Sequence, residues 1–342
     1  MRDLADYSLL QHNTFGIDAR CRRFVEFADV EEAREAAFLL QTAKQPFLII
    51  GGGSNLLLTG DYAGTVVHSA IHGIEPSAQA DGTVLLRVGS GEVWDEVVAL
   101  CVEQGWHGAE NLSLIPGEVG ATAVQNIGAY GVEVSHIIYK VEAVDISDGH
   151  TVVIEAADCH YGYRQSRFKG EWHNRYLITH VTYRLTTHFT PCLDYGNIRD
   201  VLRQRTVNSH CPTFNANDLR QAIIAIRREK LPDPAEEGNA GSFFMNPVVE
   251  RPFFEQLLTQ YPQMPYYTVG ESGVKIPAGW LIEQCGWKGR SLGPAGVHDR
   301  QALVLVNRGG ATGADIVALS DAIRSAVYER FGITIMPEVN IV

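Results

Sequence analysis

The segment from residue 115 to residue 131 constrains the fold of this chain more than any other. It reads IPGEVGATAVQNIGAYG, has four glycines, and carries Glu118 as its only charged residue. A stable surface helix is excluded, because each glycine weakens a helix and the segment lacks a polar face. Glycines let a backbone lie close against a flat or anionic group with its amides free to donate. Two interpretations remain open here, a bound cofactor and a tight buried loop.

The composition of the chain limits how many domains it forms and which classes of partner it can bind. It has 342 residues, 45% of them hydrophobic, which is enough apolar material for two or three cores and predicts several domains. The formal net charge is −12, whereas a nucleic acid or an anionic membrane would call for a basic face. We therefore expect neither partner. A bound phosphate must be held by local features, namely backbone amides, helix N-termini or single Lys and Arg residues.

The cysteines and the apolar runs favour a cytosolic protein. The six cysteines include no C-x-x-C pair and no Cys/His cluster at metal-ligand spacing; they stand at positions 21, 101, 159, 192, 211 and 285. We interpret them as reduced and mostly structural, and we expect no metal site. The first ten residues lack the apolar run of a signal peptide, and no run of about 18 apolar residues predicts a membrane span.

A second glycine-rich turn follows a short apolar run. We expect a strand at residues 46–50, and it leads into Gly51-Gly-Gly-Ser-Asn55. A strand followed by such a turn is how α/β units present backbone amides to a phosphate. The turn matches neither G-x-G-x-x-G nor G-x-x-x-x-G-K-[ST], and Gly89-Ser-Gly91 has Trp94 where a third glycine would stand. A dinucleotide-binding fold with that fingerprint is not expected.

The elements around these two turns predict an α+β region over residues 1–190. Asp29 with Glu32 forms a capping-box variant at the head of a helix that runs to about residue 44. Asp148-Gly149 between two alternating runs is a strong hairpin signal. The other expected elements are a turn at 13–18, strands at 23–27, 83–88, 141–146, 151–155 and 176–185, and a helix at 93–104. Two glycine-rich turns in one region suit a long cofactor such as a flavin dinucleotide, which has both a pyrophosphate and a ring system.

A second α/β unit is expected after a polar, weakly periodic boundary within residues 186–212. A helix over 215–228 ends before Lys230-Leu-Pro-Asp-Pro234, because the two prolines stop it. Residues 238–247 have no periodicity and predict a loop. The remaining expected elements are helices at 251–260, 278–285 and 314–331, the last stopping at Gly332, and a strand at 301–307.

An ordered set of motifs resembles one enzyme family. The motifs are Asn13-Thr-Phe-Gly16, Gly51-Gly-Gly-Ser-Asn55, Ile115-Pro-Gly with Val119-Gly120, Asn126-Ile-Gly-Ala-Tyr-Gly131, Tyr161-Gly-Tyr-Arg-Gln-Ser166, Lys230-Leu-Pro-Asp-Pro234, Gly241-Ser-Phe-Phe244 with Asn246-Pro247, Ala278-Gly-Trp-Leu-Ile282, and Pro337-Glu-Val339. Each motif is weak alone, but the ordered set is specific and runs from about residue 12 to the C-terminus. The chain resembles the UDP-N-acetylenolpyruvoylglucosamine reductases, in the subtype with an extra tyrosine-bearing segment.

The resemblance implies a fold and a reaction. The fold is α+β, with an FAD-binding domain of the PCMH (vanillyl-alcohol-oxidase-like) type in two parts, 1–68 and 69–210, followed by an α/β substrate-binding domain at 211–342. In that family NADPH reduces the FAD, which passes a hydride to UDP-N-acetylglucosamine enolpyruvate and gives UDP-N-acetylmuramate for peptidoglycan. Noncovalent FAD is expected, because the 51–55 turn has no His where related oxidases attach their flavin. A monomer is expected.

The resemblance also assigns residues to the site. The cofactor-binding residues are Gly51, Gly52, Gly53, Ser54, Asn55, Ile115, Pro116, Gly117, Gly120, Ala121, Gln125, Asn126, Gly128, Tyr130 and Gly131. The catalytic residues are Arg164 and Glu338, which would polarise the substrate carboxylate, and Ser242, which would deliver a proton. The substrate contacts are Tyr195, Lys230, Asn246, Lys275 and Gln301.

Elementary chemistry supports the implied roles of Arg164, Glu338 and Ser242 to different degrees. Hydride addition to the enolpyruvyl double bond leaves negative charge on the conjugated carboxylate, so a cation or an acid must stabilise it. Arg164 suits this task because a guanidinium is always charged and its fork matches a carboxylate. Glu338 must be protonated or act through a partner, since an ionised carboxylate would repel the developing charge. A serine hydroxyl is a weak acid, so the role of Ser242 rests on the resemblance.

Two residues depart from the family pattern. Met245 stands where many members carry Lys, which removes a charge near the substrate site. Glu118 occupies a usually small position in the flavin segment, and its carboxylate is expected to point away from the cofactor. Two other interpretations stay open: another flavin oxidoreductase on the same scaffold, and a non-catalytic nucleotide-sugar binder that has lost its flavin.

Overall fold

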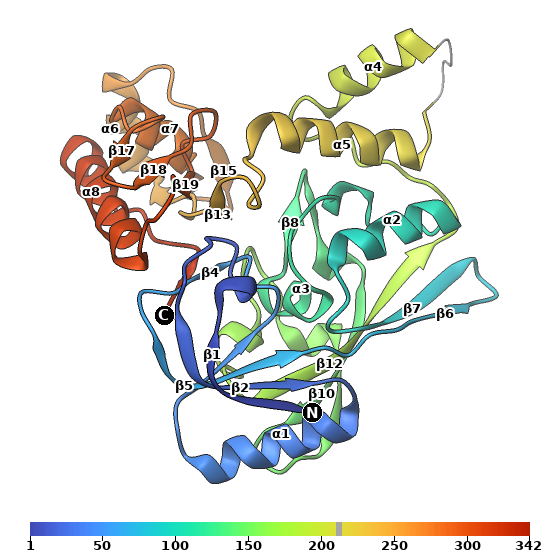
Figure 1. Cartoon of the computed structure of the whole chain (residues 1–342). Helices are drawn as coiled ribbons and strands as arrows, with labels where there is room; N and C mark the ends of the chain where they lie inside the picture. Colours follow the sequence, from blue (N-terminus) through green and yellow to red (C-terminus); the bar gives the residue numbers. More distant parts are fainter. Residues whose placement is uncertain (210–213) are drawn as a thin grey trace. The chain divides into compact units, whose positions relative to one another are not determined.

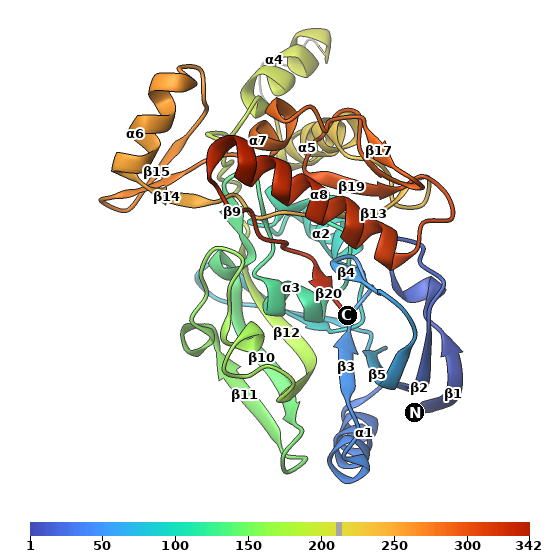
Figure 2. The same ribbon diagram turned by 90° about the vertical axis from the view of Figure 1, so that its left-hand side faces the viewer.

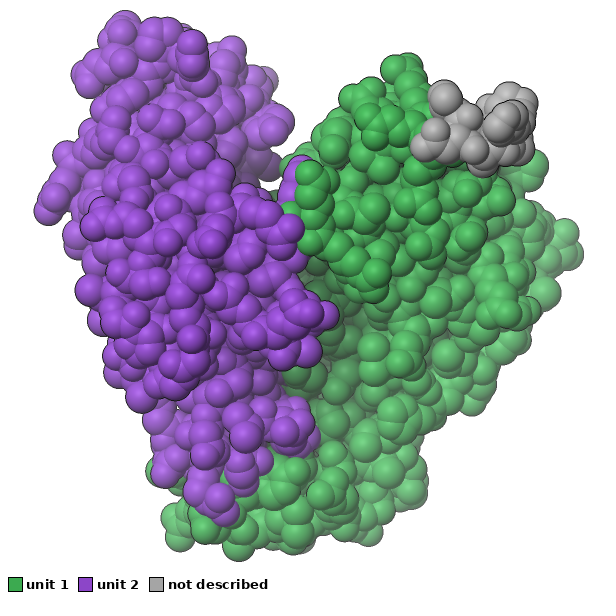
Figure 3. Space-filling model, turned by 45° about the horizontal axis from the view of Figure 1, so that its top comes forward, with its two compact units in different colours: residues 1–7, 21–52, 63–229 green, residues 8–20, 53–62, 230–342 purple. Residues whose placement is uncertain are grey.

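The computed structural model describes residues 1–209 and 214–342, which form two compact units (Figure 3). Unit 1 comprises Met1–Tyr7, Cys21–Gly52 and Ala63–Glu229. Unit 2 comprises Ser8–Arg20, Gly53–Tyr62 and Lys230–Val342. The predicted three-part domain division stays a prediction, and its boundary between residues 210 and 211 lies outside the described residues, as does Cys211.

The first sheet of unit 1 has the order β1-β2-β5-β3 and is covered by α1 (Figure 1). Its elements are β1 (Arg2–Ser8), β2 (Arg20–Phe27), α1 (Val30–Ala43), β3 (Phe47–Ile50) and β5 (Tyr62–Ser69). Strands β3 and β5 are parallel, with Ile50 opposite His68. The side chain of Asp29 accepts a hydrogen bond from the amide of Glu32 and caps α1, as the sequence predicts. The alanine-rich face of α1 is buried in the core with Val25 and Val67.

The second sheet of unit 1 is antiparallel, in the order β11-β10-β12-β7-β6. Its strands are β6 (Ile74–Ala78), β7 (Thr83–Gly89), β10 (Ile138–Asp145), β11 (Thr151–Glu155) and β12 (Tyr176–Thr186). The hairpin predicted around Asp148-Gly149 is confirmed by the β10–β11 pairing. The helices α2 (Trp94–Gln104) and α3 (Val119–Gln125) pack on one face, because Val141, Val181 and Tyr183 alternate toward them.

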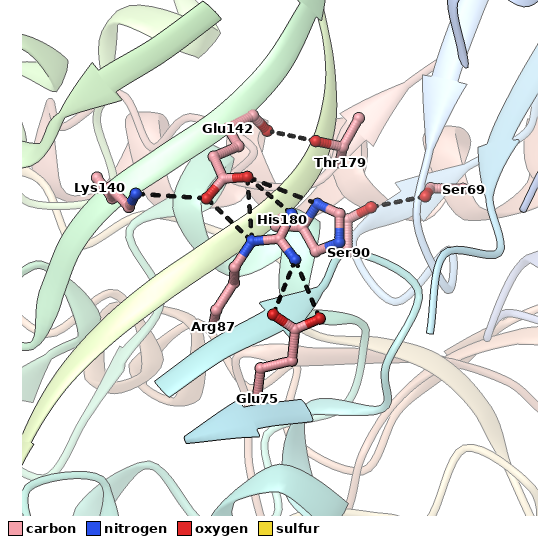
Figure 4. Close-up of polar contacts among 8 residues, drawn as sticks. All are labelled: Ser69, Glu75, Arg87, Ser90, Lys140, Glu142, Thr179 and His180. Carbon is pink, nitrogen blue, oxygen red and sulfur yellow. Dashed lines mark hydrogen bonds and ion pairs between the residues drawn. The ribbon is translucent and has the colours of Figure 1, made fainter. Parts of the chain in front are cut away.

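The other face of this sheet carries a polar cluster (Figure 4). Arg87 lies between two carboxylates, with Nη2 2.8 Å from Glu142 and Nη1 3.2 Å from Glu75. Lys140 lies 3.5 Å from Glu142, and Nδ1 of the buried His180 lies 4.0 Å from the same carboxylate. Burial and the charge of Arg87 lower the pKa of His180 below its ordinary value. The cluster keeps His180 neutral near neutral pH.

A helical pair closes unit 1. The helices are α4 (Ile198–Ser209) and α5 (Ala216–Lys230). Helix α5 was predicted, and it ends at Lys230 before the two prolines. Helix α4 was missed, because most of its residues are polar; of its side chains whose burial is described, over 198–205, Ile198 and Leu202 are the ones buried against α5. The polar segment 186–212 therefore holds more regular structure than its composition predicts.

Unit 2 is built on the sheet β13-β19-β18-β17 with α8 packed against it. These elements are β13 (Gly238–Ser242), β17 (Ser291–Leu292), β18 (Ala295–Val297), β19 (Val304–Asn307) and α8 (Gly313–Phe331). Helix α8 stops at Gly332, whose φ of 65° is left-handed, as the sequence predicts. The loop expected over 238–247 is wrong in its first half, which is β13. The signal is weak because Gly238-Asn-Ala-Gly-Ser242 has no alternating pattern.

Smaller elements complete the described chain. A three-stranded sheet in the order β14-β16-β15 packs with α6 and consists of β14 (Val248–Glu250), β15 (Tyr267–Val269) and β16 (Gly273–Lys275), with α6 at Arg251–Gln260. Helix α7 spans Ala278–Gln284, and two paired two-residue strands, β4 (Leu56–Leu57) and β20 (Asn340–Ile341), lie side by side (Figure 2). The short 3-10 helices are η1 (Leu10–His12), η2 (Glu110–Leu112), η3 (Val134–His136), η4 (Ala156–Cys159) and η5 (Arg167–Lys169). No helix in the described ranges is both long enough and apolar enough to span a bilayer.

Candidate active site

The glycine-rich segment 115–131 folds into α3 and β8 (Gly128–Ala129), and β8 forms a small hairpin with the following strand β9 (Val132–Glu133). One side of α3 is buried through Val119, Thr122 and Ala123. Its other side is partly exposed and consists of small or uncharged residues, namely Gly120, Ala121, Val124 and Gln125. The segment is therefore neither a surface helix nor a wholly buried loop. A flat apolar ring could cover this exposed side without displacing a charge.

Asn126 fixes the end of α3. It is fully buried in a left-handed conformation with φ of 45°. Its Nδ2 donates to Glu133 and to the carbonyl of Gly162, both at 2.8 Å, and its Oδ1 accepts from the amide of Ser135. The side chain is thus used inside the protein. Its expected contribution to cofactor binding stays a prediction.

Arg164 lies against the same segment. Its Nη2 donates to the carbonyl of Gly128 at 2.8 Å, and its Nη1 lies 3.4 Å from the carbonyl of Asn126. A Cβ placed on Gly128 would lie 3.1 Å from the carbonyl oxygen of Val132 and 3.3 Å from that Nη1, so the glycine leaves room for both groups. The structure thereby brings one predicted catalytic residue onto the predicted cofactor segment within unit 1.

The two glycine-rich turns meet inside unit 1. A Cβ placed on Gly52 would lie 3.5 Å from the Cα of Gly117, and one on Gly51 would lie 3.3 Å from the Cβ of Ala121. The backbones of the two turns therefore lie within about one side-chain atom of each other. This adjacency is what one cofactor spanning both turns requires.

The amides at the head of α3 are already bonded, contrary to the expectation that this segment offers free donors. The amide of Val119 donates to the carbonyl of Glu92 and that of Gly120 to the carbonyl of Ser90, both at 2.9 Å. These two positions have no amide left for a phosphate. The expected phosphate contact of the 51–55 turn stays a prediction.

Glu118 lies beside the first glycine-rich turn, because Cβ atoms placed on Gly51 and Gly52 would lie 3.3 and 3.5 Å from its carboxylate oxygens. The expectation that this carboxylate points away from the cofactor stays a prediction. Both carboxylate oxygens lie 3.1 Å from Nε2 of His68, and Nδ1 of His68 lies 3.0 Å from Glu26. Burial opposes a charged imidazole, but the two carboxylates outweigh it, and the pKa of His68 is raised above its ordinary value.

In unit 2 the segment of Glu338 runs beside that of Ser242. The amide of Glu338 donates to the carbonyl of Phe243 at 2.8 Å, and the amide of Met245 donates to Met336 at 2.9 Å. Ser242 is exposed at the end of β13, whereas the following Phe243 is buried and anchors it. The structure thus brings together the other two predicted catalytic residues, which are far apart in the sequence.

The 53–55 part of the first turn belongs to unit 2 and adjoins the same segment. The Nδ2 of Asn55 lies 3.4 Å from the carbonyl of Glu338, and the carbonyl of Asn55 accepts from the amide of Asn340. A Cβ on Gly53 would lie 1.9 Å from the carbonyl oxygen of His12, so only glycine fits there. A predicted cofactor residue and a predicted catalytic residue are therefore neighbours in unit 2.

Three residues that are predicted to bind the substrate, Asn246, Gln301 and Lys275, already interact with other residues of the protein. Asn246 accepts the amide of Ala278 at the head of α7, at 2.9 Å. Gln301 accepts the amide of Leu303 at 3.4 Å, and the ammonium of Lys275 lies 5.9 Å from the ring of Tyr267. Lys230 is exposed at the end of α5. Their contacts with a substrate stay predictions.

Tyr195 belongs to unit 1 and lies on the tip of the cofactor segment. Its ring is half exposed and meets the ring of Tyr130 edge to face at 6.2 Å. Asn111, which the sequence analysis missed, donates from Nδ2 to the carbonyls of Tyr130 and Cys192 at 3.0 and 2.9 Å. It thereby ties the two segments together. No local signal in the sequence indicates this, because Asn111 and Cys192 are 81 positions apart.

Known protein families match both halves of the chain. Residues 21–155 match the FAD binding domain family, and residues 233–342 match the family described as UDP-N-acetylenolpyruvoylglucosamine reductase, C-terminal domain. The α+β fold, the adjoining glycine turns and the first match define the class of protein. It is an FAD-dependent oxidoreductase.

Known relatives extend over almost the whole chain. A UDP-N-acetylenolpyruvoylglucosamine reductase from Bacteroides fragilis is 55% identical over 338 residues, covering 98% of this chain and 99% of the relative. One from Porphyromonas gingivalis is 47% identical over 337 residues, covering 98% and 97%. The crystal structure of the Thermus caldophilus reductase shares the fold, with a TM-score of 0.66 at 21% identity over 99% of this chain and 98% of that one. The chain belongs to the UDP-N-acetylenolpyruvoylglucosamine reductase family, which confirms the predicted family, flavin fold and FAD cofactor.

Proposed function

We propose that this chain reduces UDP-N-acetylglucosamine enolpyruvate to UDP-N-acetylmuramate, with NADPH as the electron donor and noncovalent FAD as the carrier. Family membership supports the reaction. The observation that carries the proposal is the pairing of the Ser242 strand end with the Glu338 segment in unit 2, through the 2.8 Å bond from the Glu338 amide to Phe243. It places a hydroxyl and a carboxyl group on adjacent backbones. A monomer in the cytosol belongs to the same proposal.

The adjoining turns fit a dinucleotide cofactor. Residues 51–55 would hold the pyrophosphate, and the uncharged side of α3 with Gly128 would lie under the ring. When bound, FAD supplies the hydride for the terminal carbon of the enolpyruvyl double bond. The Cβ positions of Gly51 and Gly52 lie 3.3 and 3.5 Å from atoms of the 115–131 segment, so one cofactor could reach both turns.

Arg164 would stabilise the charge that develops on the substrate carboxylate. A guanidinium stays charged at any physiological pH and offers two parallel donors to a carboxylate. Its bonds to the carbonyls of Asn126 and Gly128 hold it in position before the reaction, so little reorganisation is needed. Glu338 would support the same charge as a protonated carboxyl group, since its ionised form would repel it.

Ser242 would donate the proton to the carbon next to the carboxylate. Its hydroxyl is a weak acid, so its environment must stabilise the alkoxide while the proton moves. The strand end exposes Ser242, and the buried Phe243 and Phe244 fix the backbone on its C-terminal side. Unit 2 therefore contributes by positioning the Ser242 hydroxyl more than by making it acidic.

The substrate's diphosphate needs a cation in a chain whose net charge is −12. Lys230, exposed at the end of α5, would supply it, with Asn246, Lys275 and Gln301 as further contacts. Tyr195 would cover the bound substrate from the tyrosine-bearing segment. Met245 supplies no charge where many family members carry Lys, so these remaining groups would bear more of the binding.

Separating the two half-reactions tests this proposal. Under anaerobic conditions NADPH should bleach the flavin, and UDP-N-acetylglucosamine enolpyruvate should restore its oxidised spectrum. Ser242→Ala should keep the bleaching and slow the restoration by about 100-fold or more, since positioned proton transfer contributes that much. Ser291→Ala, which changes an exposed serine on β17 of the same unit, is the matched control. Loss of both half-reactions in Ser242→Ala would count against Ser242 as the proton donor. A wild-type protein whose flavin stays reduced after substrate addition would contradict the proposed reaction.

A further inference from the structure

Glu118 places a carboxylate beside the glycine turn that is proposed to hold the cofactor phosphate. It precedes α3, and its oxygens would be within 3.5 Å of Cβ atoms placed on Gly51 and Gly52. The side chain is about 15% exposed, so water screens its charge poorly. Two anionic groups held close together in such surroundings repel each other. A flavin site of this design needs a compensating cation.

His68 is the group that faces Glu118. It lies at the end of β5 and is itself buried, with Nε2 3.1 Å from both oxygens of Glu118. Its other ring nitrogen lies 3.0 Å from Glu26 of β2. An imidazole whose two nitrogens both meet carboxylates is best satisfied as the doubly protonated cation, which has two N–H donors. The ring of Phe24 stacks on His68 at 6.3 Å and excludes water from one side.

The residues that lie against Glu26, His68 and Glu118 come from β1, β2 and the head of α3. From β1, Arg2 lies 2.7 Å from Glu26, and Tyr7 stacks on Phe24. From β2 comes Glu26, and from the head of α3 comes Glu118. With His68 charged, the two carboxylates are balanced by Arg2 and His68. With His68 neutral, the carboxylate of Glu118 loses its only compensating partner in this group.

We propose that His68 acts as the counter-cation of the flavin site, neutralising Glu118 so that the adjoining glycine turns accept the anionic pyrophosphate of FAD. This inference rests on the proposed assignment of those turns to FAD. It makes Glu118 and His68 a matched pair, in which Glu118 weakens FAD binding when His68 is absent or neutral. Glu26 is a positioning residue that holds the imidazole from the opposite side.

Flavin affinity should then depend on pH. The pyrophosphate diester stays ionised throughout the neutral range, so the change comes from the protein. Below the raised pKa of His68 the pair is neutral and FAD binds well; above it, the bare carboxylate of Glu118 opposes the phosphate. By the reciprocity of linked equilibria, bound FAD should hold the proton on His68 more tightly.

A double-mutant cycle measured by FAD binding tests the proposal. Apoprotein is titrated with FAD, and the quenching of flavin fluorescence gives Kd at about pH 6 and about pH 8.5, on either side of the histidine range. For wild type we expect Kd to rise roughly tenfold between the two conditions. His68→Asn should bind weakly at both pH values. Glu118→Gln should bind tightly at both.

The double variant His68→Asn/Glu118→Gln decides between compensation and simple structural damage. Compensation predicts that it binds as tightly as Glu118→Gln alone, so that the loss caused by His68→Asn is rescued. Additive losses in the double variant would overturn the proposal, as would a wild-type Kd that does not change with pH. His72→Asn is the control, because His72 is an exposed histidine 3.5 Å from Glu92 in the same unit, and it should leave the pH dependence intact. Failure of the wild-type apoprotein to bind FAD at either pH would instead refute the proposed function itself, and this inference with it.

Discussion

Two histidines of unit 1 are equally buried and yet have opposite charge preferences. His68 and His180 are each 9% exposed. His68 has a carboxylate on each ring nitrogen, whereas Nδ1 of His180 finds no hydrogen-bond partner among the described residues. The carboxylate nearest to His180, Glu142, is taken by Arg87. The pKa of His68 is therefore raised and that of His180 lowered, so neighbours rather than burial decide which histidine is charged.

Removing Arg87 should break this contrast and have the largest effect on stability. Arg87→Leu leaves Glu142 half-buried with only Lys140 and His180 close to its carboxylate among the described residues, and we expect a loss of about 2 kcal/mol in the free energy of unfolding, below the usual range for a fully buried pair. The pKa of His180 should rise, because its cationic neighbour is gone while the carboxylate remains. Urea unfolding and histidine NMR titration measure the two effects.

The control for Arg87→Leu is Arg34→Leu, which breaks an exposed i,i+3 pair with Glu31 on α1. It should change stability by less than about 0.5 kcal/mol. Equal losses in the two variants would show that the cluster on the second sheet has no special role.

Replacing each histidine in turn should reveal the contrast as opposite changes in how stability depends on pH. His68, with its raised pKa, adds stability that is complete below its ordinary value of 6.5 and is lost as pH rises through its folded value. His180, with its lowered pKa, costs stability as pH falls below 6.5. Each effect amounts to about 1.4 kcal/mol per unit of pKa separation.

His68→Gln should therefore destabilise the protein most in mild acid and least at alkaline pH, whereas His180→Gln should make it more resistant to mild acid. Urea unfolding across this pH range, at fixed ionic strength, measures both. Parallel curves for the two variants would contradict the opposite assignments of charge.

Lys140→Gln should have the smallest effect. Lys140 lies 3.5 Å from Glu142 but is partly exposed and makes a single contact, so we expect a loss of about 0.5 kcal/mol or less. The titration of His180 should barely move. A change as large as that of Arg87→Leu would mean that net charge, and not the two-pronged guanidinium contact, sets the state of His180.

Local signals explain which parts of the fold the sequence predicts. The cap at Asp29, the turn at Asp148-Gly149 and the stop at Gly332 each act within a few residues, and each is confirmed. Helix α4 and strand β13 were missed because their residues carry little periodicity and their order comes from packing and pairing with distant segments.

The features of the candidate site also fall into those with a local sequence signal and those without one. The glycine turns are visible as composition, but the contact between His68 and Glu118 spans 50 positions and leaves no local trace. The salt bridge between Arg220 and Asp95 spans 125. Ser242 and Glu338 entered the site through resemblance alone, since a lone serine and a lone glutamate carry no signal of their own. The sequence alone therefore reveals the glycine-rich turns but not the long-range contacts between charged residues around them.

The most direct test of the account is an NMR titration of His68 and His180 in the same sample, without and with FAD. We predict that FAD raises the pKa of His68 further and leaves that of His180 unchanged, because in the proposed site the bound phosphate would lie beside the Glu118–His68 pair. FAD that binds while shifting neither histidine, or both alike, would contradict the placement of the flavin at the adjoining glycine turns.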